Sequence, residues 1–269
     1  MHHDRKIGSY FSEGALIAAL AIAAAAPALL AQNAPARKWS VLTFASVKPD
    51  SVAEFEAWQK EMTAAYKKAD VPSRAVVQTI MGDLFEYISI YPISHFADLD
   101  GPTPVEHSLG KEEADKLMRK GRSYIVSARR ITSLAADDLS LNTPTPTPAP
   151  YALVTIVQLA QGKSADFDAW TKNEYLPMLK KAEMKNFWVS RTLFGGDPDE
   201  RVMVRPLEKM AEIDAGPIAA RVLGEEGGRK LMSGTAGFTK SVQYRIVRYR
   251  ADLSYDMTAD RMKTSDSAK

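Results

Sequence analysis

Two stretches of this chain repeat each other, and the proline-rich segment 142–150 lies between them. The same short motifs recur in the same order on both sides of it. They are FEAW at 55–58 and FDAW at 167–170, KKA at 67–69 and 180–182, KLM at 116–118 and 230–232, and DLS at 138–140 and 252–254. Chance does not produce collinear matches over the length of a domain. The sequence therefore predicts a tandem duplication, with repeats at 39–141 and 151–255, a Pro/Thr linker at 142–150 and a polar tail at 256–269.

Each repeat carries the same order of predicted elements: strand, helix, strand, strand, helix, strand. In the first repeat an apolar run at 41–47 predicts a strand, and the apolar stripe that begins at Val52 predicts a helix. Strands at 74–81 and 84–91 flank Gly82-Asp83, which predicts a hairpin with a tight turn. This order is the ferredoxin-like plan. In the second repeat Pro177 is expected to kink or break the first helix, because proline lacks a backbone donor.

The first strand of each repeat is apolar on both of its faces. Val41, Ala45 and Val47 alternate with Leu42 and Phe44 in the first repeat, and the second repeat alternates in the same way. Such a strand requires cover on both sides. The helices of one repeat cover only one face of its sheet, so the other repeat must cover the second face. The predicted fold class is α+β, with two tandem ferredoxin-like (βαββαβ) repeats packed sheet to sheet.

This combination resembles the dimeric α/β-barrel superfamily, which includes antibiotic-biosynthesis monooxygenases, NIPSNAP-like proteins and haem-binding relatives of chlorite dismutase. The resemblance rests on the element order, on the tandem fusion and on two stretches, Trp170 to Ala182 and Leu223 to Gly227. It implies a single-chain version of the dimeric α/β barrel, which is an internal pseudo-dimer. Members of this superfamily carry out unrelated reactions, so the resemblance implies little about activity.

The N-terminus has the features of a signal peptide at 1–31. Arg5 and Lys6 precede an apolar run that ends at Ala31, and small residues follow. Cleavage is expected after Ala31 or after Ala36, which predicts a periplasmic or secreted protein. An uncleaved anchor is the alternative, although an alanine-rich run this short is only weakly apolar. No other stretch of the sequence is apolar enough to span a membrane, so no stable span is expected after cleavage.

The composition excludes several classes of function. The chain contains no cysteine, which rules out disulfides, thiol catalysis and cysteine-ligated metal. Its formal net charge is +2, with both signs interspersed, so no nucleic-acid partner is predicted. The resemblance implies that His95 or His107 could ligate haem, but the matching residues of the other repeat are Lys209 and Arg221. No metal-ligand spacing occurs, so no metal and no cofactor are predicted.

Polar side chains on the predicted hairpins form the candidate ligand site. A two-residue turn at Gly82-Asp83 pairs Gln78 with Tyr87, and the same register in the second repeat places Arg191 opposite Arg201. This face is expected to line the space between the two sheets. Its candidate ligand-binding residues are Gln78, Tyr87, Tyr91, Arg191, Arg201 and Arg205.

Two arginines at directly opposed positions repel each other unless a negative group lies nearby. Arg191 and Arg201 therefore predict a bound carboxylate, phenolate or other anion. Two alternatives stay open: water solvates both side chains, or Glu86 or Glu200 pairs with them.

Together these features predict an exported protein that binds a small anionic or aromatic molecule between its two sheets. One alternative is a cofactor-free, monooxygenase-like enzyme, which the resemblance implies and which would hold an acidic aromatic substrate beside Tyr87, Tyr91 or Arg201. Another is a non-catalytic interaction module. A cavity lined by both repeats favours binding or catalysis, whereas an interface filled with side chains favours the interaction module.

Overall fold

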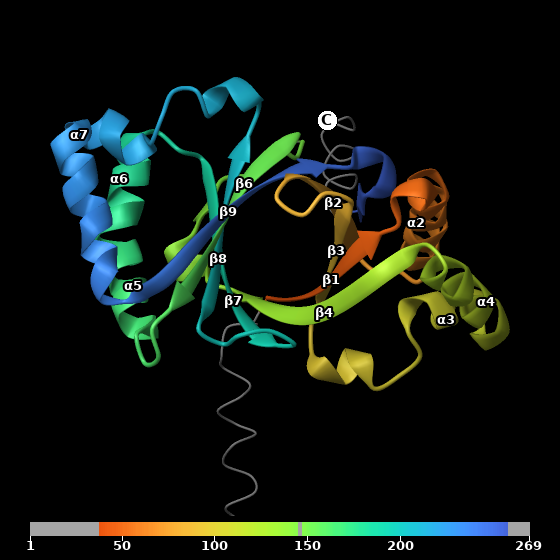
Figure 1. Cartoon of the computed structure of the whole chain (residues 1–269). Helices are drawn as coiled ribbons and strands as arrows, with labels where there is room; N and C mark the ends of the chain where they lie inside the picture. The colour runs from red at the N-terminus through yellow and green to blue at the C-terminus, as the bar shows by residue number, and fades with distance from the viewer. Residues whose placement is uncertain (1–37, 145–146, 258–269) are drawn as a thin grey trace, which may run out of the picture. The chain divides into compact units, whose positions relative to one another are not determined.

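Eight antiparallel strands form a closed barrel, and four of them come from each half of the chain (Figure 1). The computed structural model describes residues 38–144 and 147–257. The barrel strands are β1 (Trp39–Val47), β2 (Ser73–Met81), β3 (Glu86–Ile93) and β4 (Ile125–Ala135) in the first half, and β6 (Tyr151–Leu159), β7 (Asn186–Phe194), β8 (Glu200–Leu207) and β9 (Thr239–Tyr249) in the second. Two short strands, β5 (Leu141–Asn142) and β10 (Tyr255–Asp256), pair with β7 and β2.

The strand order is the same in the two halves. The first half runs β2-β3-β1-β4 and the second runs β7-β8-β6-β9. The halves join at two seams, β4 to β7 and β2 to β9. The sequence predicted two sheets packed face to face, whereas the structure makes the sheets continuous at both edges. Closure pairs the backbone groups that open sheet edges would leave without partners.

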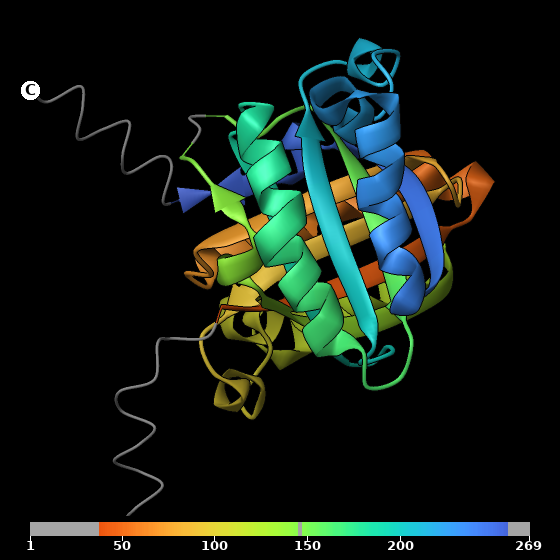
Figure 2. The same cartoon turned by 90° about the vertical axis from the view of Figure 1, so that its left-hand side faces the viewer.

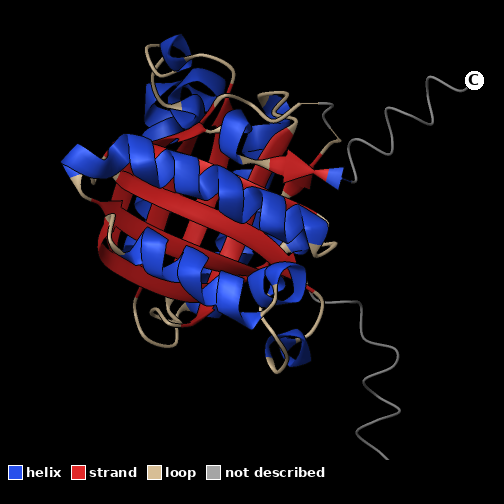
Figure 3. Ribbon diagram, turned by 90° about the vertical axis from the view of Figure 1, so that its right-hand side faces the viewer, coloured by secondary structure: helices blue, strands red, loops and turns tan. Residues whose placement is uncertain are grey.

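Helices cover the outside of the barrel on two opposite sides (Figure 1). The helices are α2 (Val52–Lys68), α3 (Pro104–Leu109) and α4 (Lys111–Arg122) on the first half, and α5 (Ser164–Trp170), α6 (Leu176–Lys181) and α7 (Ile218–Ser233) on the second. Figure 2 shows α6 and α7 across the strands of the second half, and Figure 3 shows the helices of the opposite side. In each half a repeated tryptophan joins two of the helices. The indole of Trp58 on α2 donates to the Leu117 carbonyl of α4 at 2.9 Å, and that of Trp170 on α5 donates to the Leu231 carbonyl of α7 at 3.3 Å.

Pro177 lies where the sequence predicted a kinked or broken helix. α5 ends at Trp170, a π-helical turn spans Thr171–Tyr175, and α6 begins at Leu176. Pro177 therefore occupies the first turn of α6, where a missing backbone donor costs little. The structure shows a change of helical type before Pro177 in place of the predicted kink or break, because the backbone stays in the right-handed helical region at Tyr175 and Leu176.

Both hairpins have the predicted register. Gln78 pairs with Tyr87 and Arg191 pairs with Arg201. The first turn is wider than predicted, because β3 begins at Glu86 rather than at residue 84. The backbone of that turn includes a non-glycine residue, Phe85, at φ 64°.

Each half has a hydrophobic core between its sheet and its helices, and each core contains one leucine from the other half. The first core is built around Phe55 and Val76, which are both fully buried, and it includes Leu253 from the end of the second half. The second core is built around Phe167 and includes Leu139 from the end of the first half.

The repeated DLS motif delivers these two leucines. The 3₁₀ turns Asp137–Leu139 and Ala251–Leu253 follow β4 and β9. The serine after each leucine accepts a hydrogen bond from a backbone N–H of the other half. Val189 donates to Ser140 Oγ at 3.0 Å, and Val76 donates to Ser254 Oγ at 2.8 Å. The two halves are interlocked by this reciprocal exchange of chain ends.

The segment predicted as a signal peptide, 1–31, and residues 258–269 of the predicted tail lie outside the described residues. Within the described ranges, no helix has both the length and the apolar character needed to span a membrane.

Candidate functional site

The barrel encloses a cavity of about 270 Å³. Each of the eight strands contributes at least one aliphatic or aromatic side chain to its wall. Leu42 and Ile88 belong to the first half, and Val154, Trp188 and Val204 belong to the second. The cavity therefore belongs to both halves, and neither half forms it alone.

Exposed fractions show that side chains do not fill the barrel. On β1, Val41 points toward the helices and is 1% exposed, whereas its neighbour Leu42 points into the barrel and is only half-buried. On β8, Met203 is 6% exposed on the helix side, while Val204 is half-buried on the cavity side. In a small eight-stranded barrel side chains can fill the interior or leave room for one small ligand. The interior of this barrel has room for a small ligand.

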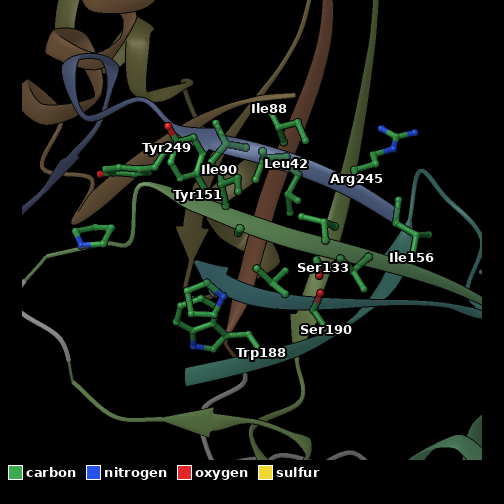
Figure 4. A pocket seen from close by; sticks show the side chains of 18 of the residues that line it. Leu42, Ile88, Ile90, Ser133, Tyr151, Ile156, Trp188, Ser190, Arg245 and Tyr249 are labelled. Atoms are coloured by element: carbon green, nitrogen blue, oxygen red, sulfur yellow. The ribbon is translucent and has the colours of Figure 1, made fainter. Parts of the chain in front are cut away.

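Aromatic side chains gather at one end of the cavity, beside the segment that joins the two halves. Tyr151 and Tyr249 lie together there, with Trp188 facing them from β7 (Figure 4). Residues 147–149 complete the wall at this end. Arg245 lies toward the other end, near Ile156 (Figure 4). The site is an apolar chamber with an aromatic end and few polar groups.

The predicted site residues lie on the opposite face of the strands from the cavity. Tyr87 packs against Phe55 of α2 with ring centroids 5.0 Å apart, and Tyr91 packs against Tyr66 of the same helix at 5.1 Å. Because strand side chains alternate, Gln78 is also on the helix side, since its neighbour Val77 lines the cavity. The prediction that this face lines the space between the sheets was wrong.

The arginines of the second half also face helices. Arg191 forms an ion pair with Asp168 of α5 at 2.8 Å, so its carboxylate partner within the protein is Asp168 rather than Glu86 or Glu200. Arg201 is 3% exposed and donates to two backbone carbonyls. Burial lowers the pKa of Arg201. The opposed arginines thus have a partner within the protein.

Arg205 is the third predicted arginine, and burial lowers its pKa as well. It lines a shallow surface depression with Glu212 and Arg221, outside the barrel. None of the six predicted residues borders the barrel cavity.

Tyr87 belongs to a polar network that ties the two halves together. Its hydroxyl donates to Glu56 Oε1 of α2 at 2.5 Å. Arg250, which follows β9 of the other half, binds both oxygens of Glu56, with Nη2 2.9 Å from Oε2. Arg250 also binds Asp252. The hydrogen bonds from Arg250, and then that from Tyr87, hold the pKa of Glu56 below its ordinary value of 4.5, and burial raises the pKa of Tyr87.

This network predicts an acid-sensitive contribution to stability. Since the pKa of Glu56 is lower in the folded than in the unfolded chain, the unfolded chain binds the proton first, and stability falls as pH drops through and below 4.5. We expect Arg250→Met to lower the free energy of unfolding at pH 7 by roughly 2 kcal/mol and to flatten its decline between about pH 6 and pH 3. Urea unfolding at a series of pH values measures both effects.

Lys120→Met is the control for this prediction. Lys120 and Glu61 form an ion pair as short as 2.6 Å, but their side chains are 46% and 47% exposed. Exposed pairs contribute little, so this variant should keep the wild-type pH profile. Equal pH profiles for Arg250→Met and the wild type would contradict the assigned role of Arg250.

The two histidines considered as haem ligands, His95 and His107, lie on the surface, away from the cavity. His95 precedes a short 3₁₀ turn and His107 lies in α3, and both are exposed. Among residues 38–144 and 147–257, no three His, Cys, Asp or Glu side chains are grouped so that they could hold a metal ion.

The residues that line the cavity are those that alternate with the predicted site residues along the same strands. A second signal was also available. Thr79 with Glu86, and Thr192 with Glu200, occur at matching places in the two halves of the chain. Both pairs form hydrogen bonds of 2.9 Å in the structure. A repeated pair of polar residues on an otherwise apolar face is a pattern that points to a specific polar contact.

No protein-family model and no curated protein matches the sequence. Solved structures do match. An anthrone oxidase-like protein is similar with a TM-score of 0.57 and 13% identity, over 83% of this chain and 94% of that one. A protein proposed to be a monooxygenase, from Lactobacillus acidophilus, has a TM-score of 0.55 and 10% identity, over 82% of this chain and 97% of that one.

A mutant chlorite dismutase from Candidatus Nitrospira defluvii has a TM-score of 0.50 and 10% identity, over 82% of this chain and 94% of that one. At these identities the similarity shows a common fold and carries no information about activity. The fold is that of the dimeric α/β-barrel superfamily, as the sequence resemblance implied.

Proposed function

We propose that this protein binds a small, apolar, aromatic molecule inside its barrel. The observation that carries the proposal is the cavity of about 270 Å³ with an apolar wall drawn from all eight strands. Ligand sites are typically concave, mostly apolar and equipped with a few polar groups. An apolar chamber that side chains leave open is costly to stability unless it serves a ligand.

The volume limits the size of the ligand. A cavity of about 150 Å³ holds one benzene ring. The barrel cavity, at about 270 Å³, therefore suits a body of about two fused or linked rings. Tyr151, Tyr249 and Trp188 favour an aromatic body, because aromatic rings pack edge to face or offset on one another.

The anionic ligand, the monooxygenase-like enzyme and the interaction module each have weaker structural support than binding of an apolar molecule in the cavity. The predicted anion rested on Arg191 and Arg201, and Asp168 supplies the negative charge that they need. The monooxygenase-like enzyme required a substrate beside Tyr87, Tyr91 or Arg201, which lie outside the cavity. The interaction module required an interface filled with side chains, and the barrel interior is open.

We also propose that the protein is exported, because 1–31 has the composition of a signal peptide. The mass of the chain recovered from its host tests this, since retention of Met1 would contradict cleavage.

Matching motifs and strand order support a further proposal, that the halves are a tandem duplication of ferredoxin-like units and form an internal pseudo-dimer.

Binding of 1-naphthylamine tests the ligand proposal. This probe has two fused rings and an aryl amine that is uncharged at pH 7, and its fluorescence shifts to shorter wavelength when it leaves water. We expect saturable binding to the wild-type protein, because the cavity offers an apolar site of suitable size. Val204→Trp places a bulky side chain in the cavity and should weaken binding at least tenfold. Ile156→Phe, a smaller change at another cavity position, should weaken it less.

Val242→Trp is the matched control, because it makes the same substitution at a residue that is 41% exposed and outside the cavity. It should bind the probe like the wild type. Circular dichroism establishes that each variant is folded. Undiminished binding by folded Val204→Trp and folded Ile156→Phe would place the probe elsewhere and refute the barrel site.

A further inference from the structure

Two glutamates occupy equivalent places in the two halves of the barrel. Glu86 begins β3 and Glu200 begins β8. Each accepts a hydrogen bond of 2.9 Å from a threonine on the adjacent strand, Thr79 for Glu86 and Thr192 for Glu200. Both threonines are buried, at 2% and 0% exposed. The two halves thus place the same polar pair on the inner face of the barrel.

The two carboxylates differ in their charged partners. Arg245 of β9 donates to Glu86 at 2.8 Å and also binds Asp83. Arg245 lies opposite Val154 on the first strand of its half, and the residue in the same place of the other half, opposite Leu42, is Ile131. Isoleucine cannot neutralise a carboxylate. Among the described residues, Glu200 has no cation within ion-pair distance.

Glu200 borders the cavity, on the same part of its wall as two serine hydroxyl groups. Ser133 on β4 pairs with Thr192, the donor to Glu200, so that it lies on the same patch of wall. Ser190 on β7 lies beside Ser133, and Figure 4 shows both side chains at one wall of the cavity. Elsewhere the wall is mainly aliphatic and aromatic. Glu200 is therefore the charged member of a polar corner in an apolar chamber.

The other charged groups at the cavity do not compete for Glu200. Arg245 is held by Glu86 and Asp83. The Arg129 guanidinium lies 4.8 Å from the centre of the Phe44 ring, in a cation–π contact, and its residue is exposed. Glu208 is exposed at a different part of the wall. Tyr151 and Tyr249 are at the aromatic end (Figure 4). A cationic partner for Glu200 must come with the ligand.

We propose that Glu200 binds the ammonium group of an amine whose apolar, aromatic body fills the rest of the barrel. This inference rests on the proposed function of the cavity and adds the chemical class of the ligand. A half-buried carboxylate with one neutral donor gains a charge-assisted hydrogen bond from an ammonium group. The surrounding apolar wall strengthens that attraction by lowering the local dielectric constant. The ligand class is a primary amine on a body of about two rings.

Competition against 1-naphthylamine, the uncharged two-ring probe, tests the ligand class. The competitors share one ring system and differ in charge: 1-naphthylmethylamine is a cation, 1-naphthalenemethanol is neutral, and 1-naphthoate is an anion. For the wild type we expect the amine to displace the probe at a concentration about tenfold below that of the alcohol, with the anion weakest. Glu200→Gln keeps the size of the side chain and should reduce the ratio of amine to alcohol affinity to about one.

Two further variants make the test specific to Glu200. Ile131→Arg gives Glu200 the partner that Glu86 already has, and it should also abolish the preference for the amine. Glu226→Gln removes the same charge from an exposed position on α7, and it should retain the preference. If Ile131→Arg does not fold, Glu200→Gln alone still decides the question.

The outcomes separate this inference from the function on which it rests. If the wild type does not bind the probe, the proposed barrel function fails. If the probe binds and the amine and alcohol displace it equally, the function stands and the amine assignment is overturned. A tenfold preference that persists in folded Glu200→Gln also overturns it, because the charge would then be recognised elsewhere.

Discussion

Replacing Leu253 by alanine is expected to lower the free energy of unfolding by about 3–5 kcal/mol. Leu253 is 0% exposed and lies in the core of the half to which it does not belong. Its removal leaves a cavity in that core, which neighbouring side chains can fill only in part. Urea unfolding followed by tryptophan fluorescence measures the loss.

Leu139→Ala is the reciprocal variant, because Leu139 is also 0% exposed and lies in the second core. It should cost a similar amount. Leu223→Ala provides the control at a leucine that is 37% exposed on α7, and it should cost less than about 1 kcal/mol. If Leu253→Ala cost no more than Leu223→Ala, the exchanged leucines would have no special role in joining the halves.

Gly195→Ala is expected to destabilise the seam between β4 and β7. Gly195 has φ 78°, and a Cβ at this position would lie 2.2 Å from the backbone oxygen of Arg130 on β4. Alanine therefore adds left-handed backbone strain and a collision with backbone that cannot rotate away. Together these effects should lower the free energy of unfolding by at least about 3 kcal/mol.

Gly216→Ala separates the strain from the collision. Gly216 has a nearly identical φ of 74°, and its added Cβ would meet nothing within 4 Å. We expect it to cost only about 1 kcal/mol, the strain alone. Parallel thermal and urea melts of the two variants measure the difference. Equal losses would mean that the seam can widen freely at Gly195, contrary to the close approach seen there.

The strand register could be predicted from the sequence because it depends on local features. Gly82-Asp83 and the apolar runs beside it placed Gln78 opposite Tyr87, and the structure agrees although the turn is wider. The closed barrel was implied by the family resemblance. The continuity of the sheets at β2 and β9 was not predicted, because that pairing joins strands far apart in sequence and depends on the folded shape of both halves.

The alternation of side chains along a strand could not show whether the candidate site residues point into the barrel or toward the helices. Periodicity tells which side chains share a face, but it does not say which face points inward when both faces are covered. On the hairpin strands, Tyr87 and Arg191 were expected in the barrel and Ile88 under the helices, and the structure places each of them on the opposite side. Glu56 and Asp168, at matching places on the helices, are the acidic partners that stabilise Tyr87 and Arg191 outside the barrel.

A ligand site between the sheets was predicted, but the size of the cavity could not be predicted from the sequence. Its volume depends on how far eight strands stand apart once both seams close, and no single segment determines that distance. The aliphatic side chains that line it would serve equally well in a filled core.

The exchanged leucines have a consequence for how the molecule melts. Because each core needs a residue that follows the last barrel strand of the other half, neither core can persist when the opposite half loses its structure. Heat or urea should therefore disrupt both halves in one cooperative transition, with no populated state in which a single half is folded. The two similar units therefore behave as one folding unit, and the barrel is either complete or unfolded.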